Sequence, residues 1–326
     1  MITNLQFNPA PRPAAAAAPQ SQKIAVVLFG EVLIDVFPDG NVLGGAPFNV
    51  ARHLQALGLH PVLISRTGTD ELRDAVMRTM SGFDMDTTGI QSDPLHPTGQ
   101  VAVHLEQEQH RFEILDNQAY DFIHPAISRL VGMSVQPELI YFGTLAQRHG
   151  VSRRALSALL RSLRRPSLLD LNLRKPWYDT QILNRSLERA DIVKLSNEEL
   201  ATLAKILRLR GQDERSQAVA LIRKYQLDRI LVTCGKRGAW LIDKEGMEAE
   251  DGNGGSQTEI VDTVGAGDAF TAVYIAGTLL GWPTQRTLMR ANRFAAAICG
   301  IRGAIPHDTD FYTPFLREWH MEDSTI

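Results

Sequence analysis

The sequence predicts an α/β fold in which helices cover both faces of a central, mostly parallel and twisted β-sheet. Short apolar runs rich in β-branched residues recur along the chain, at 24–29, 61–65, 139–143, 168–173, 191–196 and 229–235. Segments of helical composition lie between several of them, at 70–80, 152–163 and 216–225. Strands that are apolar throughout need cover on both faces, which is typical of parallel sheets. Such sheets bind ligands at the carboxyl ends of their strands.

Two further segments have the character of a small antiparallel sheet. Residues 99–115 alternate between apolar and polar side chains, and residues 31–40 are similar. We expect them to form a small β-lid, interleaved with the main domain and built from about 31–43 and 96–120. The exposed edge of such a lid favours pairing with a second copy of the chain, as a homodimer.

Composition predicts a cytoplasmic protein with one domain over 23–326. The chain has 326 residues and a net charge of −3. It therefore lacks the excess positive charge that favours binding to nucleic acid or an anionic membrane. The most apolar stretch, Ala269–Trp282, is too short to cross a bilayer and is interpreted as a buried helix. Cys234 and Cys299 form no metal-binding pattern and are interpreted as free thiols. Residues 1–22, rich in Ala and Pro, are interpreted as a disordered tail, either native or added to the protein.

The stretch DTVGAGDAF, residues 262–270, is the first candidate site. Gly265 and Gly267 form a turn that leads into an apolar helix, whose N–H groups and dipole can hold a phosphate. Phe270 stands where a dinucleotide fingerprint has Gly or Ala, and no Lys-Ser/Thr pair of a Walker loop follows. Asp268 is either a helix-capping residue or a general base that accepts the proton of an attacking alcohol.

The stretch LGGAPFNVARHLQALG, residues 43–58, is the second candidate site. Its double glycine predicts a turn, and Pro47 and Gly58 suit the two ends of the helix that follows. Asn49 lies in the first turn of that helix, where it either caps the helix or binds a polyol. Asp35 follows the first strand, and it is either a turn residue or an acceptor for vicinal hydroxyl groups.

Together these two stretches resemble the signatures of the ribokinase-like, or PfkB, carbohydrate kinases. They occur in the family's order, more than 200 residues apart, and the resemblance extends over roughly residues 24–310. It implies a ribokinase-like fold, with a β-lid over the sugar, and transfer of the γ-phosphate of ATP to a sugar hydroxyl. ATP, Mg²⁺ and an activating K⁺ are the implied cofactors, and the sugar and ATP are the implied partners.

The resemblance also implies roles for individual residues. Asp268 matches the catalytic base, and the anion hole matches Gly265, Ala266 and Gly267. Sugar contacts match Asp35, Gly44, Gly45, Asn49, Asp170, Asn172 and Arg174. Nucleotide contacts match Lys194, Thr233, Gly235, Gly238 and Asn292. Glu199 matches the residue that binds Mg²⁺ through water, and the K⁺ loop matches Asp262, Val264, Ile298, Ile301 and Gly303.

The details point to the fructokinase branch of the family. Ser196 stands where the family usually has the Asn of Asn-x-x-Glu, a change that occurs in that branch. GGAPFNVA, DNQAYDF and DLNLRKPWY resemble the same branch. D-fructose, converted to fructose 6-phosphate, is therefore the expected substrate. The alternatives are a kinase for 2-keto-3-deoxygluconate, ribose or inosine, and a non-catalytic sugar-binding regulator on the same fold.

Overall fold

The computed structural model describes residues 23–37, 40–106, 109–252 and 259–323, so the tail predicted over 1–22 lies outside it. Its main element is a nine-stranded sheet with the order β5-β4-β1-β8-β9-β10-β11-β12-β13. The strands from β5 to β11 are parallel, whereas β12 and β13 are antiparallel to their neighbours. The strands are β1 Ala25–Phe29, β4 His60–Thr67, β5 Ile90–Ser92, β8 Leu139–Gly143, β9 Ser167–Asp170, β10 Ile192–Ser196, β11 Arg229–Thr233, β12 Ala239–Asp243 and β13 Glu248–Asp251.

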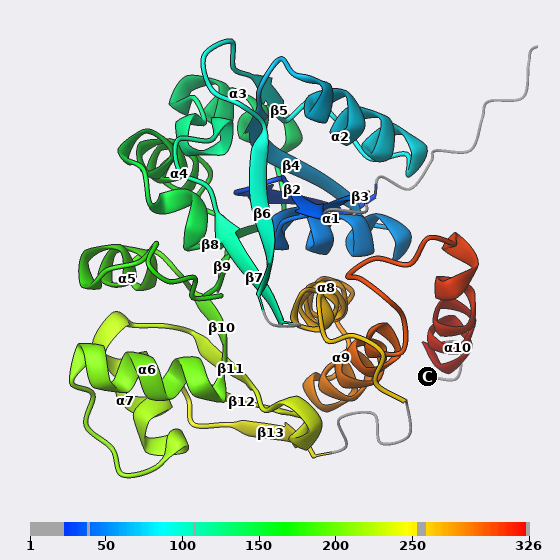
Figure 1. Ribbon diagram of the computed structural model, residues 1–326. Helices are drawn as coiled ribbons and strands as arrows, with labels where there is room; N and C mark the ends of the chain where they lie inside the picture. The colour runs from blue at the N-terminus through cyan, green and yellow to red at the C-terminus, as the bar shows by residue number, and fades with distance from the viewer. Residues whose placement is uncertain (1–22, 38–39, 107–108, 253–258, 324–326) are drawn as a thin grey trace, which may run out of the picture.

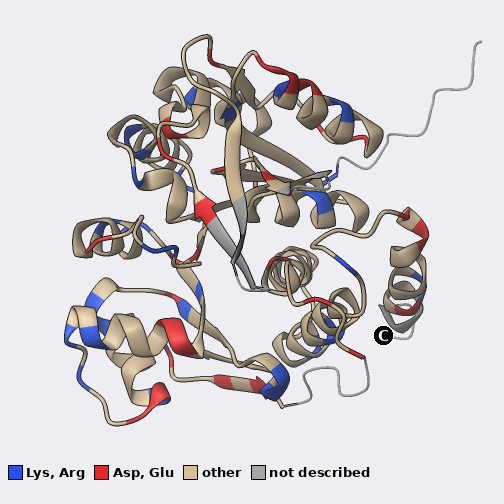
Figure 2. Cartoon of the chain, viewed as in Figure 1, with Lys and Arg blue, Asp and Glu red and all other residues tan. Residues whose placement is uncertain are grey.

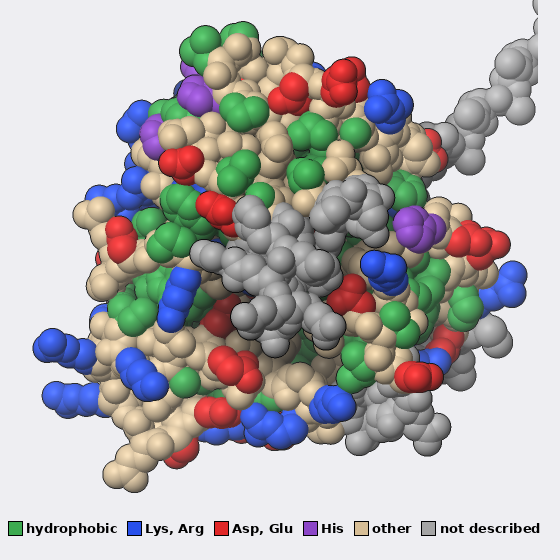
Figure 3. Space-filling model, in the orientation of Figure 1, with side chains coloured by type: hydrophobic (Ala, Val, Ile, Leu, Met, Phe, Trp, Pro, Cys, Tyr) green, Lys and Arg blue, Asp and Glu red, His purple; other side chains and the backbone are tan. Residues whose placement is uncertain are grey.

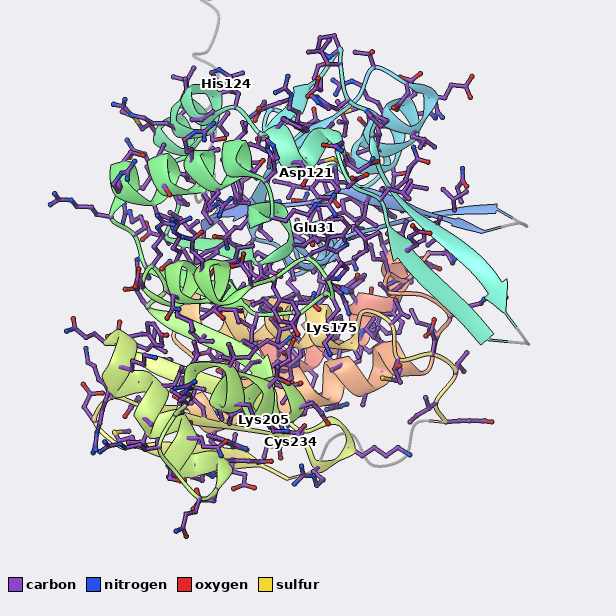
Figure 4. The ribbon with its side chains drawn as sticks, turned by 60° about the vertical axis from the view of Figure 1, so that its left-hand side comes forward. Glu31, Asp121, His124, Lys175, Lys205 and Cys234 are labelled. Carbon is purple, nitrogen blue, oxygen red and sulfur yellow. The ribbon has the colours of Figure 1, made fainter. Side chains whose placement is uncertain are left out.

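A second, four-stranded sheet of order β3-β2-β6-β7 corresponds to the small sheet expected from the sequence. β2 Leu33–Phe37 pairs antiparallel with β3 Gly40–Gly44 and parallel with β6 Gly99–Glu106. β6 pairs antiparallel with β7 Gln109–Ile114, so β3 and β7 form the edges. Figure 4 shows this sheet projecting from the main body. A homodimer through one of its edges stays a prediction.

Helices cover both faces of the large sheet, as the apolar strands predicted (Figure 1). Successive residues of a strand point to opposite faces, so Val26 and Leu28 of β1 join one core, and Val27 and Phe29 join the other. The first face packs α1 Ala46–Ala56, α2 Glu71–Gly82, α8 Ala266–Leu279, α9 Thr284–Cys299 and α10 Thr313–Asp323. The second packs α3 Pro125–Val135, α4 Gly150–Leu163, α5 Thr180–Leu187, α6 Asn197–Leu207 and α7 Glu214–Tyr225.

The surface carries charges of both signs. Figure 2 shows basic and acidic residues on the same helices, for example α2 and α7. Within the described part of the chain, every helix is too short or too polar to cross a bilayer.

Two parts of the large sheet differ from the sequence-based expectation. The strand expected over 168–173 ends at Asp170, because the backbone turns away and Asn172 takes a left-handed conformation with φ of 42°. β12 and β13 were not predicted. The sequence EAED of β13 lacks an apolar run, since its strand lies at the sheet edge, where polar side chains meet solvent.

A glycine holds the β11–β12 turn against β13, and its replacement tests this packing. A methyl group added at Gly238, where φ is 79°, would lie 1.9 Å from the Asp251 carbonyl oxygen. Gly246 has a similar φ of 82° but nothing within 4 Å of such a methyl group. Because both glycines have a positive φ, which other residues rarely adopt, each change to Ala should cost about 1–3 kcal/mol of unfolding free energy. We expect Gly238→Ala to cost about 1–3 kcal/mol more than Gly246→Ala, through overpacking.

Thermal and urea unfolding of both variants measure this difference. Equal losses in the two variants would show that the close approach of the turn to β13 contributes nothing to stability.

Candidate active site

The site forms where two helices distant in sequence begin side by side. α1 starts after Gly45 and α8 after Gly265, and each of these glycines has a positive φ, 105° and 78°. A glycine has no side chain to cap the first N–H groups of its helix, so both starts keep donors for a ligand. Asn49, in the first turn of α1, donates a 2.8 Å hydrogen bond from Nδ2 to Oδ2 of Asp268, in the first turn of α8. The two signatures therefore meet through this bond.

Asp268 has the electrostatic setting of a proton acceptor. Burial and the charge of Asp170 raise its pKa to about 6, whereas the Asn49 hydrogen bond, Lys194 and Arg174 oppose that shift. At neutral pH the carboxyl is therefore ionised, yet its affinity for a proton is higher than that of an ordinary aspartate. Asp268 occupies the first turn of α8, and the capping position itself belongs to Gly265.

Lys194 places a positive charge against the glycine turn. Its Nζ lies 3.0 Å and 3.2 Å from the two carboxylate oxygens of Asp170. A methyl group added at Gly267 would lie 3.2 Å from the same Nζ. Burial alone would lower the pKa of Lys194, but the carboxylates of Asp170, Glu199 and Asp268 raise it above its usual value, so the amine stays charged.

Asp170 itself is enclosed by protein groups. It is 1% exposed, and besides Lys194 it accepts hydrogen bonds from Thr271 Oγ1 at 3.0 Å and from the Tyr141 hydroxyl at 3.5 Å. Its predicted contact with the sugar stays a prediction. What the geometry does show is that Asp170 fixes the position of the Lys194 ammonium group.

Two acidic side chains flank the double glycine. A methyl group added at Gly45 would lie 2.8 Å from the Glu31 carbonyl oxygen, and one at Gly44 would lie 3.4 Å from Oδ2 of Asp35. Burial raises the pKa of Glu31 to about 7 and that of Asp35 to about 6, and in both cases the positive charge of Arg174 opposes the shift. Arg174 also opposes the rise in the pKa of Asp268. One exposed arginine therefore favours the ionised form of all three carboxyl groups. Figure 3 shows acidic and basic side chains interspersed on the face viewed in Figure 1.

Glu199 connects two neighbouring loops. Its Oε2 accepts a 2.8 Å hydrogen bond from the Ser196 N–H, and Ser196 Oγ accepts one from the Glu199 N–H, which caps α6. Oε1 accepts a 2.7 Å bond from the Leu173 N–H, next to Asn172. Each carboxylate oxygen keeps a second lone pair, and such oxygens are ligands that Mg²⁺ and its water accept. The predicted role in binding Mg²⁺ through water thus fits the donor set.

Apart from Lys194 on β10, the residues predicted to bind the nucleotide lie around the turn after β11. Thr233 ends that strand, its hydroxyl 3.5 Å from the Leu195 carbonyl oxygen, and the exposed Gly235 has a φ of 55°. Gly238 packs on Asp251, as described above. Asn292, on α9, donates from Nδ2 to the carboxylate of Asp251 at 2.7 Å and to its carbonyl at 3.2 Å. The structure therefore brings Asn292 to this turn, and its contact with the nucleotide stays a prediction.

The residues predicted to bind K⁺ come from two loops that Asp262 holds together. Its Oδ1 accepts a 3.0 Å bond from the Val264 N–H, and its Oδ2 accepts a 3.0 Å bond from the Gly303 N–H. The backbone N–H of Asp262 donates to Cys299, between the remaining predicted residues Ile298 and Ile301. Oxygen ligands from such loops suit a hard cation.

Sequence reasoning missed three buried polar residues of this region, namely Glu31, Tyr120 and Arg148. Glu31 follows β1 and Gly30. A charged residue just after an apolar strand could have identified it as a candidate site residue. Tyr120 lies within the stretch DNQAYDF noted above, but no role was predicted for it, and Arg148 gave no pattern of its own.

The arrangement suits phosphoryl transfer to an alcohol. It combines a carboxylate of raised pKa, N–H donors at a helix start, and a fixed ammonium group beside them. Phosphoryl transfer depends on positioning and on positive potential at the phosphoryl oxygens, while a base receives the proton of the alcohol.

Comparison with known proteins agrees with this chemistry. A model of the pfkB family of carbohydrate kinases matches residues 19–310. The chain is 29% identical over 302 residues to an uncharacterized sugar kinase of Pyrococcus horikoshii, covering 86% of this chain and 91% of that protein. It is 27% identical over 312 residues to a fructokinase of Salmonella typhimurium, covering 91% and 98%. 

A solved structure shows the same fold. It is a double-mutant fructokinase of Vibrio cholerae with fructose, ADP and a potassium ion bound, which superposes with a TM-score of 0.73 at 22% identity. The superposition covers 90% of this chain and 99% of that one. With the family model matching most of the chain, the protein belongs to the pfkB family of carbohydrate kinases.

Proposed function

We propose that the protein transfers the γ-phosphate of ATP to a hydroxyl group of D-fructose and releases fructose 6-phosphate. The observation that carries this proposal is the position of Asp268, which is hydrogen-bonded to Asn49 and lies one residue after Gly267, beside the Lys194 ammonium group. A sugar hydroxyl next to Asp268 can lose its proton to the carboxylate as its oxygen attacks the phosphorus atom. The bond to the leaving oxygen of ADP breaks in the same displacement.

The site residues fall into groups with different proposed roles. Asp35, Gly44, Gly45, Asn49, Asn172 and Arg174 would orient the sugar, with Asp170 acting through Lys194. The N–H groups of the Gly265–Gly267 turn and Lys194 Nζ would stabilise the negative charge of the phosphoryl group. Mg²⁺ bound with ATP would supply positive charge to the phosphates, and Glu199 would hold one of its water molecules. Thr233, Gly235, Gly238 and Asn292 would bind the nucleotide.

We propose D-fructose and not another acceptor because several relatives of this chain are named fructokinase. The match to the Salmonella typhimurium fructokinase covers 98% of that protein. The Vibrio cholerae fructokinase binds fructose and ADP. A kinase for 2-keto-3-deoxygluconate, ribose or inosine is the alternative, and the substrate panel below separates them.

The first prediction concerns the acceptor and the base. We expect ADP release from Mg-ATP to be fastest with D-fructose among fructose, ribose, 2-keto-3-deoxygluconate and inosine. Asp268→Asn should lower kcat by about 10²–10⁴-fold, because it removes the proton acceptor while keeping the side-chain shape. Asp228→Asn, which alters an exposed ion pair with Lys244, is the matched control and should leave kcat unchanged.

A faster reaction with another acceptor would replace fructose but keep the base. Full activity of Asp268→Asn would refute the proposed mechanism. If the wild-type protein binds sugar but transfers no phosphate to any acceptor, the sugar-binding regulator is the correct reading.

The second prediction concerns pH. Because Asp268 accepts a proton only when ionised and burial raises its pKa to about 6, kcat should fall as pH drops through 6. Asn49→Ala removes the hydrogen bond that favours the ionised carboxylate, so the fall should move to higher pH. Profiles of kcat from pH 5 to 9 test this, with Asp35→Asn showing that the fall does not come from Asp35. A shift to lower pH in Asn49→Ala would contradict the assignment.

The third prediction concerns K⁺. Replacing K⁺ by tetramethylammonium should lower kcat, since that cation is too large for a loop site. Asp262→Ala should weaken the response to added K⁺, because Asp262 joins the two loops. Equal rates in the two salts for the wild-type protein would show that the loop has no role in binding a cation.

A further inference from the structure

Three buried residues next to the site present polar atoms that make no well-formed hydrogen bond to the described residues, although the Arg148 side chain lies close enough to the Tyr120 hydroxyl to oppose the rise of its pKa. These atoms are Oε2 of Glu31, the hydroxyl of Tyr120 and Nη1 of Arg148. Glu31 is 5% exposed, Tyr120 is fully buried, and the Arg148 side chain is 6% exposed. Folded proteins pair almost all buried polar groups, so three unpaired ones together require an explanation.

The three residues are contiguous although they come from distant parts of the chain. The guanidinium of Arg148 lies 5.0 Å from the centre of the Tyr120 ring. A methyl group added at Gly99 would lie 2.8 Å from that ring and 2.7 Å from the carbonyl oxygen of Val32, the residue after Glu31. Figure 4 labels Glu31 near Asp121, the neighbour of Tyr120 and the ion-pair partner of Arg148.

The rest of the Arg148 guanidinium is already held in place. Nε and Nη2 each donate a 2.7 Å hydrogen bond to the Asp121 carboxylate, and Nη2 donates another to the Leu115 carbonyl at 2.6 Å. Its other face stacks on Trp177, 4.2 Å from the ring centre. Nη1 is therefore a donor with a fixed direction, and such a donor costs little entropy to use in binding.

The cluster adjoins the predicted sugar site. The backbone of Glu31 packs on Gly45. Burial dominates the raised pKa of Glu31, and the charges of Arg174, Asp268 and Arg148 all affect it, so its carboxyl faces the same groups that surround the base. Burial also raises the pKa of Tyr120, which keeps its hydroxyl protonated and able to donate.

We propose that Glu31, Tyr120 and Arg148 form a sugar subsite that binds a hydroxyl group other than the one that Asp268 deprotonates. This inference rests on the proposed function. A sugar hydroxyl both donates and accepts hydrogen bonds, so it can donate one to Oε2 of Glu31 and accept one from Nη1 of Arg148 or from the Tyr120 hydroxyl. With two carboxyl groups, Glu31 and Asp121, around one guanidinium, the subsite favours a neutral sugar over a sugar acid.

Tyr120→Phe tests the subsite, because it removes the unpaired hydroxyl and keeps the ring that packs on Gly99. We expect the KM and the dissociation constant for D-fructose to rise about 10-fold, with a smaller change in kcat. The thermal midpoint should stay equal or rise, since a buried polar group without a partner is gone. Glu31→Gln, which has nearly the same shape, should also weaken fructose binding.

Tyr225→Phe is the matched control, since it removes a hydroxyl that bonds to Asn184 far from the cluster. It should leave the KM unchanged. Among monodeoxy analogues of D-fructose, one should bind equally well to the wild-type protein and to Tyr120→Phe, because it lacks the hydroxyl that the cluster binds.

Calorimetric titration of fructose without ATP separates this inference from the proposed function, because binding needs no turnover. A wild-type protein that binds fructose without phosphorylating it would refute the function, and the variants would still test the subsite. An unchanged affinity in Tyr120→Phe, together with a lower thermal midpoint, would overturn the subsite and assign the hydroxyl to stability. A wild-type protein that binds none of the sugars would overturn both.

Discussion

The hydrogen bond between Asn49 and Asp268 is the contact on which the site depends, since it joins helix starts 219 residues apart in the sequence. α1 and α8 both begin after a glycine with a positive φ, and the hydrogen bond brings their first turns together. Two helix dipoles that meet there favour negative charge. A carboxylate and a phosphoryl group can therefore lie close together, which neither helix would support alone.

Burial and charge balance set the properties of the acidic groups. Burial raises the pKa of Glu31, Asp35 and Asp268 more than the nearby positive charge lowers it. The exposed Arg174 opposes the rise in all three. Lys194 is different, because Asp170 fixes it at 3.0 Å. One cation is thus held firmly beside Gly267, while the other is exposed to solvent.

The sequence predicted those parts of the molecule that depend on local pattern. Apolar runs identified the central parallel strands, and the glycine turns identified both helix starts and Asp268. The edge strand β13 was missed because EAED carries no apolar signal, whereas its neighbour β12 has the apolar sequence AWLID and was missed although that signal was present. Glu31, Tyr120 and Arg148 were missed for another reason. Their importance comes from contacts between residues far apart in the chain, such as the packing of Tyr120 on Gly99 and the stacking of Arg148 on Trp177, which no local spacing reveals.

The two halves of the site are also mechanically linked. Glu199 accepts hydrogen bonds from Ser196, at the start of α6, and from Leu173, the residue before Arg174. Lys194 lies two residues before Ser196 on β10, so the same short segment carries the fixed cation and anchors the loop of the exposed one. Trp177, later in that loop, stacks on Arg148 and so reaches the Glu31 cluster. A displacement of the β10–α6 junction would therefore be transmitted through Glu199 to the loop that carries Arg174 and Trp177.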